Sequence, residues 1–198
     1  MGGEPALLFK PVFPWVIPAF DPPYYANLYR SIDWGAGRSP VACGWYYADD
    51  MGHIIKYREY YERGTDIEEH AGSILDLSGK EEYIFTLLDT THFTPGSGAR
   101  FSIAELFDQC GLSCVEAQRP RDATKVVLLN RALALRLWPD GSEAPILQVC
   151  SNCPNTIWEL PRIRWAEYRG QSAIEHNPRE KIVQKDNHTF DELGYYLA

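Results

Sequence analysis

The chain has 198 residues, of which 45% are hydrophobic and 13% are aromatic, and its formal net charge at pH 7 is −8. This composition fits a globular domain and excludes a disordered chain, and no apolar run is long enough to span a membrane. Five cysteines are an odd number for a disulfide framework, so we expect reduced thiols. The negative charge argues against a general nucleic-acid binder, although a nuclease with an acidic metal-binding cluster needs basic residues on only one face.

The N-terminal part of the chain is rich in proline, with six prolines and several aromatic residues in positions 1–27. Because proline fixes φ and removes a backbone donor, we expect an arm or linker in residues 1–27 and one domain in residues 28–198. Three strands are predicted at the start of that domain, at residues 28–34, 41–48 and 53–61. The turn at residues 49–52 joins the last two, so these strands predict an antiparallel meander.

Helices and strands alternate after the meander. A capping box that begins at Thr65 predicts a helix to about Leu77, and the continuous apolar run at residues 83–89 predicts a buried, parallel strand. The remaining predicted elements are a helix from Ser102 to Gly111, a short strand in 112–117, a helix capped by Asp122, a strand at 145–149, a helix around 156–160, a strand at 181–184 and a terminal helix that begins at Asp186. This order predicts an α/β fold, with a mixed sheet of antiparallel and parallel strands and helices on both faces.

Two of the predicted strands end in an aspartate, Asp33 and Asp89. If these strands are parallel neighbours, both carboxylates lie at the carboxyl edge of the sheet, where ligands bind in open α/β folds. On the predicted terminal helix, His188 and Asp191 are one turn apart and present together. Carboxylate oxygens are the ligands that Mg²⁺ and Mn²⁺ prefer, and a pair of such ions can hydrolyse a phosphodiester.

Each candidate also has a structural interpretation. A strand-end aspartate is more often a turn former than a ligand, and Asp186 is explained by helix capping. His188 has an alternative as an ordinary surface or core histidine. The basic cluster Arg119, Arg121, Lys125 and Arg131 either contacts DNA phosphates or forms a solvated helix face. Cys150 and Cys153 have the spacing of half a zinc site, but no second pair accompanies them, so we expect free thiols.

With these positions in hand, the chain resembles the C-terminal nuclease domain of the large terminase subunits of tailed bacteriophages. The resemblance covers about residues 15–198 and rests on residues 17–23 leading into Tyr29–Gly35, on the apolar strand into Asp89, on residues 153–160 and on Lys185–Tyr195. The last segment, Lys-Asp-Asn-His-Thr-Phe-Asp-Glu-Leu-Gly-Tyr, is similar to the family's Asp-His-x-x-Asp-Ala-Leu-Arg-Tyr signature and is the most specific. Glu192 and Gly194 stand where the family usually has Ala and Arg.

The resemblance implies a ribonuclease H-like fold and an endonuclease that cleaves double-stranded phage DNA during genome packaging with two Mg²⁺ or Mn²⁺ ions. The metal ligands that it implies are Asp33, Asp89 and Asp191, with His188 beside them and Asp186 as a further candidate. Glu192 is either an extra ligand or a solvent-facing residue.

The resemblance also implies partners and a location. The chain has no Gly-x-x-x-x-Gly-Lys-Ser/Thr loop, so the ATPase domain of such a protein is expected upstream. The other expected partners are double-stranded DNA, the portal protein and the small terminase subunit, with no membrane, in the host cytoplasm at the procapsid portal. Two alternatives stay open, a junction resolvase-like nuclease of the same fold and a non-catalytic packaging or docking module.

Overall fold

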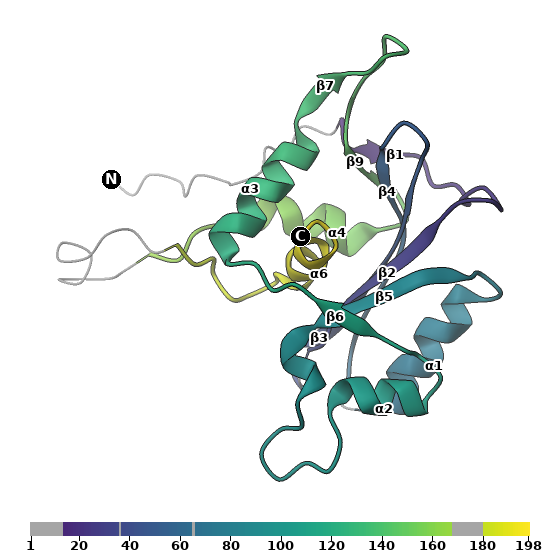
Figure 1. Ribbon diagram of the computed structural model, residues 1–198. Coiled ribbons are helices and arrows are strands. Elements are labelled where there is room, and N and C mark those ends of the chain that lie inside the picture. The colour runs from purple at the N-terminus through teal and green to yellow at the C-terminus, as the bar shows by residue number, and fades with distance from the viewer. Residues whose placement is uncertain (1–13, 36, 65, 168–179) are drawn as a thin grey trace.

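The structure is a computed structural model that describes residues 14–35, 37–64, 66–167 and 180–198. Its centre is a seven-stranded mixed sheet (Figure 1). In order across the sheet, the strands are β1 (Val16–Ile17), β9 (Leu147–Cys150), β4 (Ile54–Arg63), β3 (Pro40–Ala48), β2 (Leu28–Asp33), β5 (Tyr83–Asp89) and β6 (Val115–Ala117). Strands β2, β3 and β4 form the predicted antiparallel meander. Strand β5 joins β2 in parallel and β6 joins β5 in parallel, so the predicted mixed α/β architecture is confirmed.

Most of the predicted helices and strands are present, in the predicted order. Outside the main sheet, β7 (Leu135–Leu137) pairs with β8 (Glu143–Pro145) in a separate hairpin. The helices are α1 (Ile67–Ser78), α2 (Ile103–Gln109), α3 (Asp122–Leu133), α4 (Pro154–Glu159) and α6 (His188–Tyr196), with 3-10 turns η1 (Thr90–Phe93) and η2 (Leu160–Arg162). None of the helices in the described ranges is long and apolar enough to cross a membrane.

Helices cover both faces of the sheet, because successive side chains of a buried strand point to opposite faces. Trp45 of β3 belongs to the core on the side of α1 and α2, where Ile74 and Phe107 are fully buried. Its neighbour Tyr46 belongs to the core on the side of α3, α4 and α6, which includes Phe190. Helix α6 packs across β2 and β3 at the middle of the molecule (Figure 1). The sheet therefore has a separate hydrophobic core on each face.

The first described part of the chain is bound to the sheet. Val16–Ile17 forms the short edge strand β1, which pairs in parallel with β9. Trp15 is buried in the core beside α3, α4 and α6. A two-residue strand gives no periodic signal, and the proline pattern of residues 1–27 did not predict it. This part of the proline-rich segment therefore packs against the domain.

Of three predicted helix starts, one is confirmed and two need correction or refinement. Helix α1 is capped by Asp66, whose carboxylate accepts hydrogen bonds from the backbone N–H groups of the first turn, while Thr65 lies outside the described residues. The capping box of Ser102 and Glu105 on α2 is confirmed. Asp122 does not cap α3, because it is the first helical residue and its carboxylate accepts a hydrogen bond from the N–H of Ile182 at 3.1 Å.

The region before α6 also differs from the prediction. The strand predicted at residues 181–184 is wrong, because this segment bonds to residues 164 and 166 and forms only an isolated bridge, Trp165 to Ile182. Asp186 does not cap α6 but turns the chain with a left-handed φ of 51°, a conformation that aspartate tolerates better than most residues. The N-cap residue is Asn187. The turn delivers His188 to the first position of the helix.

Candidate active site

Asp33 and Asp89 lie side by side at the carboxyl edge of the sheet. Ile32 and Leu88, both fully buried, are register partners in the parallel pair of β2 and β5, so the aspartates that follow them are neighbours. Burial of the apolar strands thus holds two carboxylates together at the edge. The structure brings these two predicted site residues together.

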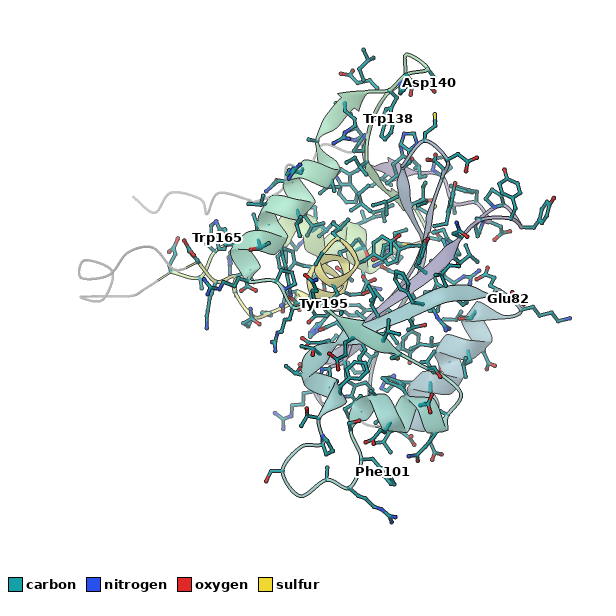
Figure 2. The ribbon with its side chains drawn as sticks, viewed as in Figure 1. Glu82, Phe101, Trp138, Asp140, Trp165 and Tyr195 are labelled. Atoms are coloured by element: carbon teal, nitrogen blue, oxygen red, sulfur yellow. The ribbon has the colours of Figure 1, made fainter. Side chains whose placement is uncertain are left out.

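The hydroxyl of Tyr195 lies between the two carboxylates. It donates a hydrogen bond to Asp89 Oδ2 at 2.9 Å and is 3.3 Å from Asp33 Oδ1. Burial, together with the neighbouring aspartates, raises the pKa of Tyr195 far above its ordinary value, so the hydroxyl stays a donor. Figure 2 labels Tyr195 at the middle of the molecule. Sequence reasoning did not select Tyr195 as a site residue, although the terminal motif ends on it.

Helix α6 adds His188 and a third aspartate. His188 Nδ1 is 2.9 Å from Asp33 Oδ2, and although burial lowers the pKa of His188, the bond to Asp33 and the surrounding carboxylates raise it overall. Asp191 accepts a hydrogen bond from Asn187 Nδ2 at 2.7 Å and pairs with Lys125, whose Nζ is 2.6 Å from Oδ1. Burial raises the pKa of Asp191 to about 6, Lys125 opposes this rise, and the charge of Asp33 adds to it.

Asp89 has its own set of donors. Burial raises the pKa of Asp89, but hydrogen bonds from the N–H and hydroxyl of Thr91, with Tyr195 and Arg119, lower it overall. Arg119 Nε is 3.2 Å from Asp89 Oδ2, and the side chain of Arg119 is 56% exposed. His92, in the turn after Asp89, also faces these charges, and burial lowers the pKa of His92 overall. Its closeness to a strand-end aspartate was the signal that sequence reasoning missed.

A buried glutamate fixes the beginning of α6. The carboxylate of Glu159 is fully buried and accepts hydrogen bonds from the N–H of Thr189 at 2.7 Å, from the Thr189 hydroxyl and from the Tyr61 hydroxyl. A carboxylate at a helix N-terminus satisfies free N–H groups and complements the helix dipole. Glu159 therefore positions the helical turn that carries His188 and Asp191.

Glu192 has a role that neither sequence alternative anticipated. It is fully buried, and its carboxylate forms an ion pair with Lys56 at 2.8 Å and accepts a hydrogen bond from Tyr46. Gly44 makes room for it, since a Cβ at that position would lie 2.1 Å from Glu192 Oε1. The expectation of a metal ligand or a solvent-facing residue is therefore corrected, because Glu192 anchors α6 to the sheet.

The other predicted residues are distributed unevenly around the site. Arg119 and Arg121 are exposed, as a DNA contact requires. Lys125 is buried against Asp191, so its predicted phosphate contact is wrong for this arrangement. No hydrogen bond in the described part of the chain joins Asp186 to the three aspartates. Cys150 and Cys153 are buried free thiols.

The donor chemistry of the site fits a hard divalent cation, but each of the three carboxylates already bonds to other protein groups. Two carboxylates converge on one hydroxyl, and oxygen ligands at such a point suit Mg²⁺ or Mn²⁺. As arranged, however, the described residues contain no group of three or more His, Cys, Asp or Glu side chains that could hold a metal ion. The Tyr195 hydroxyl lies between Asp33 and Asp89, and the Lys125 ammonium pairs with Asp191.

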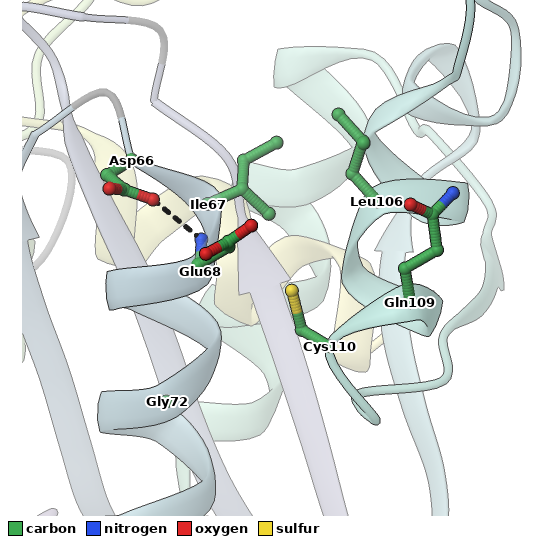
Figure 3. A pocket seen from close by; sticks show the side chains of 7 residues that line it. All are labelled: Asp66, Ile67, Glu68, Gly72, Leu106, Gln109 and Cys110. Atoms are coloured by element: carbon green, nitrogen blue, oxygen red, sulfur yellow. Dashed lines mark hydrogen bonds between the residues drawn. The ribbon is translucent and has the colours of Figure 1, made fainter.

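A separate pocket lies between α1 and α2. It has a volume of about 850 Å³ and is lined, among others, by Ile67 and Gly72 of α1, by Leu106 of α2 and by Cys110, which follows α2 (Figure 3). The Asp66 carboxylate at its rim bonds to the N–H of Glu68 as a helix cap. None of the candidate site residues lines this pocket, so the sheet edge remains the candidate active site.

No model of a protein family and no curated protein sequence matches this chain. Solved structures do. The large terminase of a thermophilic bacteriophage is 17% identical with a TM-score of 0.72, and the match covers 96% of this chain and 44% of that one. The nuclease domain of the bacteriophage SPP1 large terminase with bound Mn is 16% identical with a TM-score of 0.63, covering 93% and 97%. The P22 large terminase nuclease domain is 16% identical with a TM-score of 0.65, covering 93% and 87%.

These likenesses establish the fold. The chain has the fold of large terminase nuclease domains, as the resemblance in its sequence implied. It spans less than half of the length of the large terminase from the thermophilic bacteriophage.

Proposed function

We propose that this chain is the nuclease domain of a large terminase subunit and cleaves double-stranded DNA as a divalent-metal-dependent endonuclease during genome packaging. The observation that carries the proposal is the meeting of Asp33 and Asp89 at one sheet edge, within the terminase nuclease fold, with Asp191 on α6 near enough that the charge of Asp33 adds to the rise that burial causes in the pKa of Asp191. The SPP1 domain of the same fold is described with bound Mn. The alternative of a non-catalytic module gives no reason for buried carboxylates to converge.

In this proposal, Asp33, Asp89 and Asp191 hold two Mg²⁺ or Mn²⁺ ions. Bound there, such ions lower the pKa of the attacking water and stabilise the leaving 3′ oxygen. His188 fixes the orientation of the Asp33 carboxylate through Nδ1, and Tyr195 holds Asp33 and Asp89 at a common point. Arg119, exposed beside Asp89, supplies a positive charge for the scissile phosphate, and Arg121 extends the basic surface.

The proposal also places the domain in a larger protein. Because the match covers only 44% of the large terminase from the thermophilic bacteriophage, we propose an ATPase domain upstream in the same polypeptide. Residues 1–27 would lead from that domain into the nuclease domain of residues 28–198. The portal protein and the small terminase subunit are the proposed assembly partners, at the procapsid portal in the host cytoplasm.

The test is cleavage of supercoiled plasmid with EDTA, Mg²⁺ or Mn²⁺. We expect nicking and linearisation with either metal, none with EDTA, and none for Asp33→Asn, with the thermal unfolding of that variant close to the parent. Asp140→Asn is the matched control, because Asp140 is exposed at the tip of the β7–β8 hairpin (Figure 2). Metal-dependent cutting by Asp33→Asn, or no cutting by the parent chain, would overturn the assignment. Preference for branched over linear DNA would point to a junction resolvase.

A further inference from the structure

The candidate active site contains a buried ammonium group that the proposed metal chemistry does not use. Lys125 reaches the site from α3, and its side chain is only 3% exposed. Its Nζ lies 2.6 Å from Asp191 Oδ1 and 4.5 Å from the centre of the Tyr195 ring. Burial of a charged amine is costly unless a partner compensates it, and Asp191 is that partner.

Gly194 gives Lys125 its route to Asp191. A Cβ at position 194 would lie 2.6 Å from Cδ and 2.8 Å from Cγ of Lys125, so the aliphatic part of the lysine passes directly over the glycine. Any other residue there would push the lysine stem aside. The absence of a side chain at 194 and the buried position of the amine are therefore two parts of one arrangement.

The ammonium bonds to an oxygen of Asp191 that the proposed function assigns to a metal ion. A carboxylate oxygen that accepts a hydrogen bond from an ammonium uses one of its lone pairs for that cation. The other oxygen of Asp191 accepts a hydrogen bond from Asn187. Both oxygens of Asp191 thus accept a bond, as do both oxygens of Asp33 and of Asp89. Asp191 differs in that its cation is a buried ammonium, whereas the cation beside Asp89, Arg119, has a side chain that is 56% exposed.

We propose that the Lys125 ammonium is a built-in cation that competes with divalent metal ions for Asp191, and that Gly194 admits it to the site. This inference rests on the proposed function, since Asp191 is a metal ligand only there. Asp191 becomes available as a ligand only when Lys125 withdraws, so occupancy by a second ion is set by this lysine.

The test measures Mn²⁺ binding by titration calorimetry, with no DNA present, so that the readout is independent of cutting. Lys125→Met removes the charge and keeps a stem of similar shape over Gly194. We expect this variant to bind Mn²⁺ at least about tenfold more tightly than the parent chain, or to bind an additional ion, since close charge pairs are commonly coupled by more than that factor. Gly194→Ala keeps every charge but displaces the lysine stem, and it should shift affinity in the same direction.

The matched control is Lys56→Met, which removes a second buried lysine of the described residues, the partner of Glu192. Thermal unfolding identifies folded variants, and Gly194→Ala keeps the test open if Lys125→Met does not fold. Unchanged or weaker Mn²⁺ binding by folded Lys125→Met and Gly194→Ala would overturn the proposal while leaving the nuclease assignment in place. An equal gain in Mn²⁺ affinity in Lys56→Met would also overturn it, because the gain would then be an effect of net charge alone. Failure of every protein to bind Mn²⁺ would instead overturn the proposed function, and this inference with it.

Discussion

Replacing Glu159 with alanine should both destabilise the domain and disorganise the candidate active site. Glu159 lies at the end of α4, outside the set of aspartates, and acts on the site only through the N-terminal turn of α6. Its carboxylate is fully buried and receives three hydrogen bonds, two from Thr189 and one from Tyr61. Truncation therefore removes an acceptor and leaves buried donors without a partner.

The size of the effect follows from these contacts. A hydrogen bond to a charged group contributes about 1.5–3 kcal/mol, and the three bonds here share one acceptor, so their effects do not add fully. Removing one member of a buried charged network costs about 3–5 kcal/mol, which we expect for Glu159→Ala. Glu159→Gln keeps the shape and one acceptor oxygen, and should cost less. Domains of this kind have a free energy of unfolding of about 5–15 kcal/mol, so the loss is large but leaves a folded fraction to study.

Urea denaturation followed by tryptophan fluorescence measures the change in the free energy of unfolding. Glu82→Ala is the control, because Glu82 is an exposed glutamate before β5 (Figure 2) and should change stability by less than about 0.5 kcal/mol. Plasmid cleavage at temperatures where Glu159→Ala is folded should fall below that of Glu82→Ala. A change in stability under about 1 kcal/mol for Glu159→Ala would refute the view that this carboxylate holds α6.

Two further predictions concern groups outside the site. Although burial raises the pKa of Glu81, its hydrogen bond with Arg58 lowers it overall below the ordinary 4.5. Its contribution to stability is thus present above pH 4.5 and is lost as the pH falls through the lower folded value. Glu81→Gln should be less stable than the parent at neutral pH in urea denaturation, but not at acidic pH below the folded pKa; an equal deficit at both would contradict this. Burial also raises the pKa of the Cys43 and Cys153 thiols, so both should resist a thiol reagent until urea unfolds the chain, and rapid native-state labelling of all five cysteines would be the contrary result.

The main elements and the edge that carries the aspartates could be predicted because local patterns determine them. The apolar runs before Asp33 and Asp89 predict strands, and parallel pairing then fixes where both carboxylates lie. The failures came where long-range contacts decide. Asp122 looked like a cap but bonds to Ile182, 60 positions away, and the segment at 181–184 pairs with a loop instead of the sheet.

The buried ion pairs were the other feature that could not be predicted from the sequence. Glu192 and Lys56 are 136 positions apart, and Lys125 and Asp191 are 66 positions apart, so no spacing rule relates them. From its sequence neighbours, Lys125 is predicted to be a surface residue. It is buried because α6 provides a carboxylate, Asp191, as its partner and a glycine, Gly194, against which its aliphatic stem fits. Gly194 was noted only as a departure from the family signature, and the structure supplies its reason.

The docking of α6 on the sheet determines whether the candidate active site is assembled. His188 and Asp33 are 155 positions apart, so the site exists only after the most non-local contacts of the fold have formed. Local opening of α6 alone would separate His188, Asp191 and Tyr195 from Asp33 and Asp89 while the sheet stays intact. The fraction of competent molecules then follows the free energy of this local opening, which hydrogen exchange of the α6 amides reports. Binding or mutation that stabilises or destabilises the docked α6 would therefore change the fraction of molecules with an assembled site, without unfolding the domain.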